Sequence, residues 1–179
     1  LGILKMFKRY RFKKLIKSLK SYGIYNDISL DTLFIFPDKI KIGSYIGPNA
    51  SINGLGGVEI NNGTIIGPNF TVHSANHNFK NSKSIPYDES FEYRAVLIEE
   101  NVWIGGNVII TPGSTIGEGA IIGAGAVVSG KIPPLSIVIG NPCQIIKKRD
   151  EAKYYALKEQ GLIYMKLKKE LKTVQPNYE

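Results

Sequence analysis

The chain has 179 residues, which is enough for one compact domain with short appendages and too few for two independent catalytic domains. Its formal net charge of +8 suggests a nucleic-acid partner, but the basic residues gather at the two ends, and the nearly neutral middle has no basic patch interleaved with aromatic residues. A single cysteine, Cys143, excludes an intrachain disulfide and agrees with a reducing compartment. We therefore expect a cytoplasmic protein that binds no nucleic acid.

Residues 1–36 are predicted to form a basic N-terminal helical segment. Apolar residues recur among many cations in the pattern of an amphipathic helix, at Leu4, Phe7, Phe12, Leu15, Ile16 and Leu19. The cations interrupt every apolar run before it reaches the length of a secretory signal or a membrane span. Two roles stay open: capping the end of the fold that follows, which we favour, and lying on an anionic membrane surface, at the inner face of the membrane.

Residues 37–148 repeat with a period of six. An amphipathic helix needs apolar residues at spacings of three and four, and a strand needs alternation, so a spacing of six fits neither. It predicts a triangular solenoid, in which each hexapeptide supplies a short strand and a turn, and three of them complete one coil around an aliphatic column. The alternative is an ordinary antiparallel β protein, in which the many isoleucines would share this six-residue spacing only by chance. The repeated residues are Ile40, Ile46 and Ile52, then after a two-residue slip Ile60, Ile66 and Val72, and later Ile98, Ile104, Ile110, Ile116, Ile122 and Val128.

The six-residue rhythm stops between Val72 and Val96, and residues 73–95 are predicted to form an irregular, polar and aromatic excursion loop. An excursion from a regular scaffold is where chemistry tends to lie. The loop holds both histidines of the chain, His73 and His77. Spacing by four suits two metal ligands on a helix, but this is a coil edge and a loop, and the sequence supplies no third histidine or cysteine cluster. We expect no metal.

Residues 149–179 are predicted to form a charged C-terminal helical extension. Tyr155, Leu162 and Leu167 supply its apolar side. We expect this side to fold back on the assembled protein.

Residues 40–150 carry a specific combination of motifs. Asn101-Val102-Trp103-Ile104-Gly105-Gly106 is followed by Ile110-Thr111-Pro112-Gly113, Ile116-Gly117, Ile122-Gly123-Ala124-Gly125-Ala126-Val127-Val128, Ile132-Pro133-Pro134 and Gly140-Asn141-Pro142-Cys143. This combination resembles the hexapeptide-repeat acyltransferases, in the sugar O-acetyltransferase branch of maltose and galactoside acetyltransferase. The resemblance implies a mainly β fold, a left-handed parallel β-helix of hexapeptide repeats with N- and C-terminal helical segments. It also implies acetyl-CoA as acyl donor and a homotrimer with active sites between its subunits.

The family places its catalytic histidine at the start of the excursion loop, where His77 in Ala75-Asn76-His77 matches. A sugar hydroxyl is a poor nucleophile, and a neutral imidazole, whose ordinary pKa is near ~6.5, can take its proton at neutral pH. We expect His77 to act as general base and then to return the proton to the departing CoA thiolate. His73 is the competing candidate, interpreted as structural or loop-orienting. Cys143 has no histidine nearby in sequence, so we expect direct transfer without a covalent intermediate.

The resemblance also implies a set of cofactor contacts. The backbone N–H of Gly106 is the expected oxyanion donor, beside a groove for the pantetheine arm. Relatives hold the CoA phosphates with two arginines, and this chain departs from that pattern with Gln144 and Lys147, although Lys148 or Arg149 can substitute. The expected cofactor-binding residues are Gly106, Ala124, Ser129, Gly130, Lys131, Gln144 and Lys147.

For the acceptor we expect contacts from Asn53, Asn76 and Trp103. Asn53 lies where the repeat slips by two, and Trp103 packs beside the site in the family, or else belongs to the core or a trimer interface. Together these features predict an acetyl-CoA-dependent O-acetyltransferase that acts on a hydroxyl of a sugar or polysaccharide precursor. The alternatives are N-acyl transfer to an amino sugar, acetylation of an antibiotic, and a non-catalytic β-helical scaffold. The galactoside-type acceptor residues do not align cleanly, so the sequence names neither the sugar nor the hydroxyl nor the length of the acyl chain.

Overall fold

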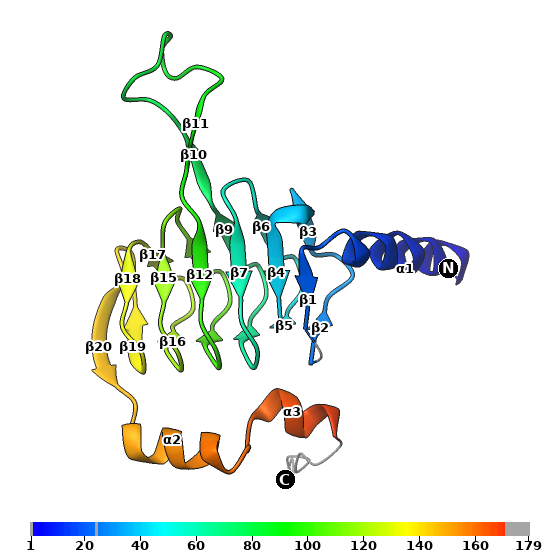
Figure 1. The fold of residues 1–179 in the computed structure, drawn as a ribbon, viewed down its shortest axis with the longest axis vertical. Helices are drawn as coiled ribbons and strands as arrows, with labels where there is room; N and C mark the ends of the chain where they lie inside the picture. Colours follow the sequence, from blue (N-terminus) through cyan, green and yellow to red (C-terminus); the bar gives the residue numbers. More distant parts are fainter. Residues whose placement is uncertain (1, 24, 171–179) are drawn as a thin grey trace.

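Short strands stack into the three walls of a prism, each wall a sheet of strands from successive coils (Figure 1). The structure is a computed structural model and describes residues 2–23 and 25–170. The first sheet contains β1 (Ser21–Tyr22), β4 (Ile40–Ile42), β7 (Val58–Ile60), β12 (Val96–Ile98), β15 (Thr115–Ile116) and β18 (Lys131–Ile132). The second contains β2 (Asp27–Ile28), β5 (Tyr45–Ile46), β8 (Ile65–Ile66), β13 (Trp103–Ile104), β16 (Ile121–Ile122) and β19 (Ser136–Ile139). The third contains β3 (Leu33–Ile35), β6 (Ser51–Asn53), β9 (Thr71–His73), β14 (Ile109–Ile110) and β17 (Val127–Val128).

The core is the aliphatic column that the six-residue period predicts. Every apolar residue of the two repeated runs is at most 1% exposed. Neighbouring coils pair in parallel and in register, so that Ile46 lies beside Ile66, Ile66 beside Ile104, and Ile104 beside Ile122. Complete burial of one such side chain contributes about 1.5 to 3 kcal/mol to the stability of the fold, and each coil adds further side chains to the same column. The predicted fold class, a left-handed parallel β-helix of hexapeptide repeats, is confirmed.

Asparagines shape the corner between the second and third sheets. Asn49, Asn69 and Asn107 all have φ of 58°, a left-handed conformation that asparagine tolerates better than most residues. Nδ2 of Asn49 donates to Oδ1 of Asn69 at 3.3 Å, and Nδ2 of Asn69 donates to Oδ1 of Asn107 at 2.9 Å. This ladder keeps the corner regular over three successive coils.

The prism begins earlier than the predicted boundary at residue 37. Helix α1 covers Gly2–Lys17, and β1, β2 and β3 then complete a coil before the short 3-10 helix η1 (Pro37–Lys39). Ile28 and Phe34 stand in the same six-residue frame as Ile40 and are buried like it. The coil escaped the sequence prediction because a phenylalanine takes the place of a β-branched residue.

Helix α1 meets the prism through its last turns. Phe12, Leu15 and Ile16 pack against the core, in agreement with the predicted capping role. The side chains of Leu4 and Phe7, which were assigned to the same apolar side, lie outside the part of the chain that the structure describes.

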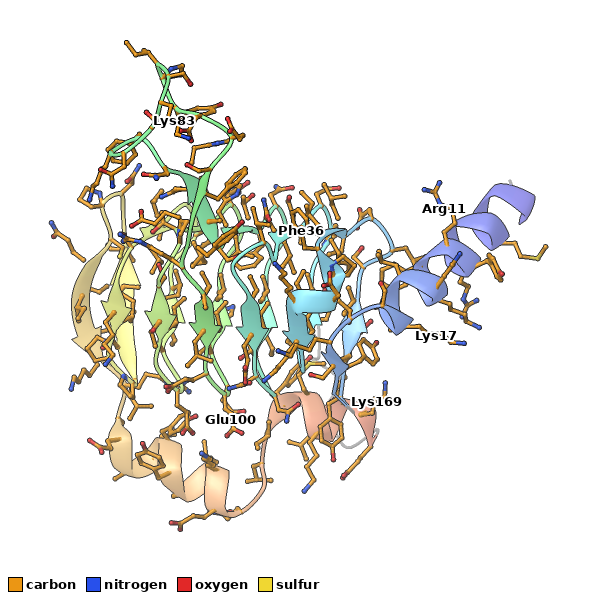
Figure 2. All side chains as sticks on the ribbon, turned by 45° about the horizontal axis from the view of Figure 1, so that its top comes forward. Arg11, Lys17, Phe36, Lys83, Glu100 and Lys169 are labelled. Atoms are coloured by element: carbon orange, nitrogen blue, oxygen red, sulfur yellow. The ribbon has the colours of Figure 1, made fainter. Side chains whose placement is uncertain are left out.

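The predicted loop of residues 73–95 contains regular structure. It leaves the prism as a two-stranded antiparallel hairpin, β10 (Ala75–His77) and β11 (Phe91–Tyr93), whose outer end carries Lys83 (Figures 1 and 2). The hairpin stands at the corner between the third and first sheets, because β9 precedes it and β12 follows it.

The C-terminal part folds back on its own chain. Strand β20 (Gln144–Lys148) pairs antiparallel with β19, and α2 (Glu151–Glu159) and α3 (Tyr164–Lys169) then run along the side of the prism opposite the hairpin (Figure 1). The buried residues here are Tyr154 and Met165, whereas Tyr155 and Leu162 of the predicted apolar side are exposed. The chain leaves helical geometry between α2 and α3, so a single helical spacing does not extend across both. Residues 171–179 of the predicted extension lie outside the described residues.

Candidate active site

His77 lies at the end of β10, held between two aromatic rings of the same hairpin. Its ring centroid is 3.7 Å from that of Tyr87, in a stacked arrangement, and 4.4 Å from that of Phe91. Its Nδ1 lies 3.4 Å from the backbone carbonyl oxygen of Asp88. A proton on Nδ1 can be donated to that carbonyl, which favours the tautomer with a free lone pair on Nε2. The arrangement therefore presents a half-buried imidazole that can accept a proton.

The carboxylate of Asp88 organises the loop that supplies this carbonyl. It accepts hydrogen bonds from the hydroxyl and the backbone N–H of Ser90 and from the backbone N–H of Lys83. The bond from the Ser90 hydroxyl, followed by the backbone bonds, lowers the pKa of Asp88. Asp88 thus contacts His77 through its backbone and uses its side chain to hold the turn.

Ser74 joins the foot of the hairpin to the coil below. Its side chain is fully buried, and Oγ donates to the carbonyl oxygen of Asn53 at 2.7 Å and accepts from the N–H of Gly56 at 2.9 Å. The N–H of Arg94, on the returning strand, donates to the carbonyl oxygen of Ser74 at 2.9 Å. A Cβ on Gly56 would lie 1.9 Å from that same carbonyl oxygen, so only glycine fits there. The position of β10, and with it the imidazole, is set by these contacts.

Two of the three predicted acceptor residues, Asn76 and Asn53, lie at the hairpin edge. Asn76 is exposed on β10, next to His77, and Asn53 lies at the foot of the hairpin, where its Oδ1 accepts from the N–H of Leu55 and shapes the slip in the repeat. His73, the competing base, is exposed at the end of β9 and pairs in register with Asn53. The part of the chain that the structure describes holds no cluster of three or more His, Cys, Asp or Glu side chains able to bind a metal ion.

Trp103 is on the second sheet, away from the hairpin. Its side chain is 57% exposed, so it does not belong to the core. It lines a cavity of about 410 Å³ between this sheet and the C-terminal helices, together with Tyr154, Leu157 and Ile163.

Gly106 and Ala124 stack on each other at the corner between the second and third sheets. The N–H of Gly125 donates to the carbonyl oxygen of Gly106 at 2.9 Å, and a Cβ on Gly105 would lie 2.6 Å from the nitrogen of Ala124. Neither the N–H of Gly106 nor that of Ala124 donates to any group within residues 2–23 and 25–170. The corner therefore offers a smooth edge with two backbone donors one coil apart.

The other predicted cofactor residues lie at the C-terminal end of the prism. Ser129, Gly130 and Lys131 form the corner between the third and first sheets, and Gln144 and Lys147 are exposed on β20. Within one chain, the structure brings His77, Asn76 and Asn53 to the hairpin edge, and Gly106 and Ala124 to the neighbouring corner across the third sheet.

Sequence reasoning did not single out Tyr87, Phe91 or Ser74. The two aromatics were visible as part of an aromatic loop, but Phe91 opposes His77 only because β10 and β11 pair in that register. Ser74 gave no signal in the sequence, because its role depends on two backbone groups that lie about twenty residues earlier.

Comparison with known proteins agrees with the predicted repeat. Residues 95–130 match the family described as bacterial transferase hexapeptide (six repeats). The chain is 35% identical over 123 residues to WbbJ of Escherichia coli (strain K12), whose name describes it provisionally as a lipopolysaccharide biosynthesis O-acetyl transferase; the match covers 65% of this chain and 61% of WbbJ. The chain thus spans less than two thirds of the length of the curated relatives first matched.

Two solved structures are similar over most of both chains. A maltose O-acetyltransferase from Clostridium difficile 630 is 34% identical, with a TM-score of 0.64 over 78% of this chain and 74% of that one. A hexapeptide-repeat acetyltransferase from Vibrio cholerae O1 biovar eltor, solved in complex with acetyl-CoA, is 26% identical, with a TM-score of 0.71 over 80% of this chain and 79% of that one.

Proposed function

The chain belongs to the hexapeptide-repeat acyltransferase family, and on this basis we propose that it transfers an acetyl group from acetyl-CoA to a hydroxyl of a sugar or polysaccharide precursor. The observation that carries the proposal is the imidazole of His77, held between Tyr87 and Phe91 with Nδ1 turned to a backbone carbonyl. The acetyl-CoA complex of the Vibrio relative supports the choice of donor, and the names of WbbJ and of the maltose O-acetyltransferase support a saccharide hydroxyl as acceptor.

In this proposal, His77 is the general base. Nε2 takes the proton of the acceptor hydroxyl while the hydroxyl oxygen attacks the thioester carbonyl carbon, so the new C–O bond forms as the O–H bond breaks. When the C–S bond breaks, the imidazolium gives the same proton to the thiolate. The Asp88 carbonyl keeps the second nitrogen protonated throughout, which favours the productive orientation of the ring.

The stacked corner is the proposed site of the acyl donor. The N–H of Gly106, which has no acceptor among the described residues, can stabilise the negative charge developing on the thioester oxygen, and the N–H of Ala124 can bind an amide carbonyl of the pantetheine arm. The exposed Lys131 and Lys147 at the end of the prism carry charge suited to the phosphates. Gly105, Gly106, Ala124 and Gly125 stand here in two successive coils, and their small size leaves room for a thin ligand beside Pro68.

The hairpin edge and the donor corner are two different corners of one prism, so we propose that the enzyme is a homotrimer in which the hairpin of one subunit meets the corner of the next. A mixing experiment tests this arrangement together with the measured molar mass. His77→Ala and Gly106→Leu are each expected to be inactive, and co-expression of the two is expected to restore activity, because mixed trimers contain intact sites. A trimer without restored activity would contradict sites shared between subunits.

The assignment of the base is tested by comparing His77→Ala with His73→Ala in an assay of thiol release from acetyl-CoA with a panel of sugars. We expect His77→Ala to lower kcat by about 10² to 10⁴ and to leave acetyl-CoA binding by calorimetry unchanged, because only proton transfer is lost. His73→Ala removes an exposed imidazole from the same chain and is the matched control. Unchanged turnover in His77→Ala would overturn the assignment, and a folded wild-type protein without acetyl-CoA binding would favour a scaffold.

The same panel separates O- from N-acetylation. Amino sugars and their N-blocked counterparts are supplied side by side, and the product is located by mass spectrometry. We expect transfer to persist with the N-blocked sugars, because the acceptor atom is a hydroxyl oxygen. Transfer confined to free amines would replace the proposal with N-acyl transfer.

A further inference from the structure

The first twenty residues carry a formal charge equal to that of the whole protein. They contain eight Lys and Arg and no Asp or Glu. Taking these eight from the 23 basic residues of the chain leaves 15, which equals its 15 Asp and Glu. The remaining residues sum to zero because an excess of four cations after residue 146 is offset by an excess of four anions in residues 21–146. The first twenty residues are therefore the largest concentration of positive charge in the sequence, with no acidic residue among them.

Helix α1 carries most of this charge away from the prism. In Figure 1 it projects from the end of the β-helix, with the N-terminus at its far end, and Figure 2 labels Arg11 and Lys17 on it. Among the side chains of α1 that the structure describes, those packed against the core are Phe12, Leu15 and Ile16, in its last turns. The C-terminal end of α1 is therefore held against the prism.

The outer side of α1 combines cations with apolar side chains. Tyr10 follows Met6 by four residues, Lys13 and Lys14 follow Tyr10 by three and four, and Lys17 follows them by four and three. Residues at these spacings share one face, which here is the side of the helix away from the core anchors. Met6 is 68% exposed and Tyr10 is 70% exposed, and all three lysines are exposed. Two large side chains nearer the N-terminus of α1 and three lysines nearer its C-terminus thus share one solvent-facing side.

We propose that α1 binds the surface of an anionic lipid bilayer. Lysines beside the bilayer are attracted by the charged headgroups, and the side chains of Met6 and Tyr10 can enter the boundary between headgroups and acyl chains. A nucleic acid would satisfy the charge equally, but it would leave the exposed Met6 without a partner. In the part of the chain that the structure describes, no helix has the length and apolar character needed to cross a bilayer.

This surface is separate from the acetyl-transfer site and does not depend on it. The test measures sedimentation of the full chain with vesicles of phosphatidylcholine alone or mixed with phosphatidylglycerol, at low and high salt. We expect binding only to the mixed vesicles, with a bound fraction that falls as salt rises. Combined Lys13→Glu, Lys14→Glu and Lys17→Glu is expected to weaken vesicle binding at least about tenfold.

A matched control changes the net charge by the same amount elsewhere. Lys83→Glu, Lys153→Glu and Lys169→Glu alter exposed lysines of the hairpin, α2 and α3 and are expected to keep vesicle binding. Equal losses in the two triple variants would overturn the proposal, because net charge alone would then explain the binding. So would sedimentation with neither vesicle type, or tighter binding of single-stranded RNA than of vesicles.

The apolar contribution is measured with the pair Met6→Ser and Tyr10→Ser, which leaves the charge unchanged. We expect this variant to lose the part of the binding that persists at high salt. Circular dichroism and the melting temperature identify any variant that fails to fold, and the serine pair tests the same surface without a change of charge. Unchanged high-salt binding in the serine pair would contradict an insertion of these side chains.

Discussion

Replacing Ser74 with alanine removes the hydroxyl that ties the histidine hairpin to the prism. The substitution keeps the Cβ and the backbone, so the carbonyl that accepts from the Arg94 N–H stays in place. It removes two hydrogen bonds at once, the one donated to the carbonyl oxygen of Asn53 and the one accepted from the N–H of Gly56. Both partners are backbone groups in the partly buried slip of the repeat.

The expected loss of stability follows from these two bonds. A typical hydrogen bond contributes about 0.5 to 1.5 kcal/mol net, so the pair gives about 1 to 3 kcal/mol. For a chain of this length, 1 kcal/mol lowers the Tm by about 2 to 4 °C. Because the lost contacts lie at the foot of β10, we also expect kcat to fall by about tenfold through misplacement of His77, with little change in the KM for acetyl-CoA.

Ser136→Ala is the matched control for this prediction. Ser136 is equally buried, but its Oγ has no hydrogen-bond partner among the described residues, so its removal is expected to be neutral or stabilising. The measurements are thermal unfolding and steady-state kinetics of both variants. The reasoning is refuted if Ser74→Ala has the same Tm as Ser136→Ala. It is also refuted if Ser74→Ala loses stability while its kcat stays at the wild-type value.

Three further predictions concern the imidazole, the core and the C-terminal helices. Tyr87→Ala is expected to lower kcat by about tenfold with unchanged acetyl-CoA binding by calorimetry, because the ring stacked on His77 is lost; unchanged kcat would contradict an orienting role. Ile104→Ala is expected to cost about 2 to 5 kcal/mol in urea unfolding, whereas the 40% exposed Ile109 should cost clearly less as alanine; similar costs would refute the axial position of Ile104. Burial, followed by the hydrogen bond to Glu118, raises the pKa of Tyr154, so its contribution to stability is complete below the unfolded pKa of about 10 and is lost as pH rises above it. Above about pH 10 the free energy of unfolding of Tyr154→Phe should therefore fall less steeply with pH than that of the wild type. Parallel plots of this free energy against pH for the two proteins would count against the reasoning.

The prism could be predicted because its signal is local and repeated. Each rung needs one small apolar side chain pointing to the axis, so residues such as Ile98 and Ile104 mark their own positions without knowledge of their neighbours. The first coil shows the limit of that signal, because Phe34 fills the same rung position with a different residue type. The six-residue spacing extends back to Phe34, but the β-branched residue type on which the prediction relied does not.

The hairpin could be predicted only as an interruption. The histidine and the aromatic residues were visible, but the contact of His77 with Phe91 depends on how a long turn sets the strand register. The phase of the C-terminal helices depends in the same way on the break between α2 and α3, which decided that Tyr154 is buried and Tyr155 exposed.

What the sequence by itself determined is the period, and the period predicts a three-sided coil because three hexapeptides per coil bring every sixth residue to one axis. Only the tertiary structure decided which corner each candidate residue occupies. His77 stands at one corner and Gly106 at the next, since the corner of a residue depends on every slip and insertion that precedes it. Only the tertiary structure shows that the N–H groups of Gly106 and Ala124 have no acceptor among the described residues, and that the hydroxyl of Ser74 is buried and bonded. The reason is that hydrogen bonds between coils join residues about twenty positions apart.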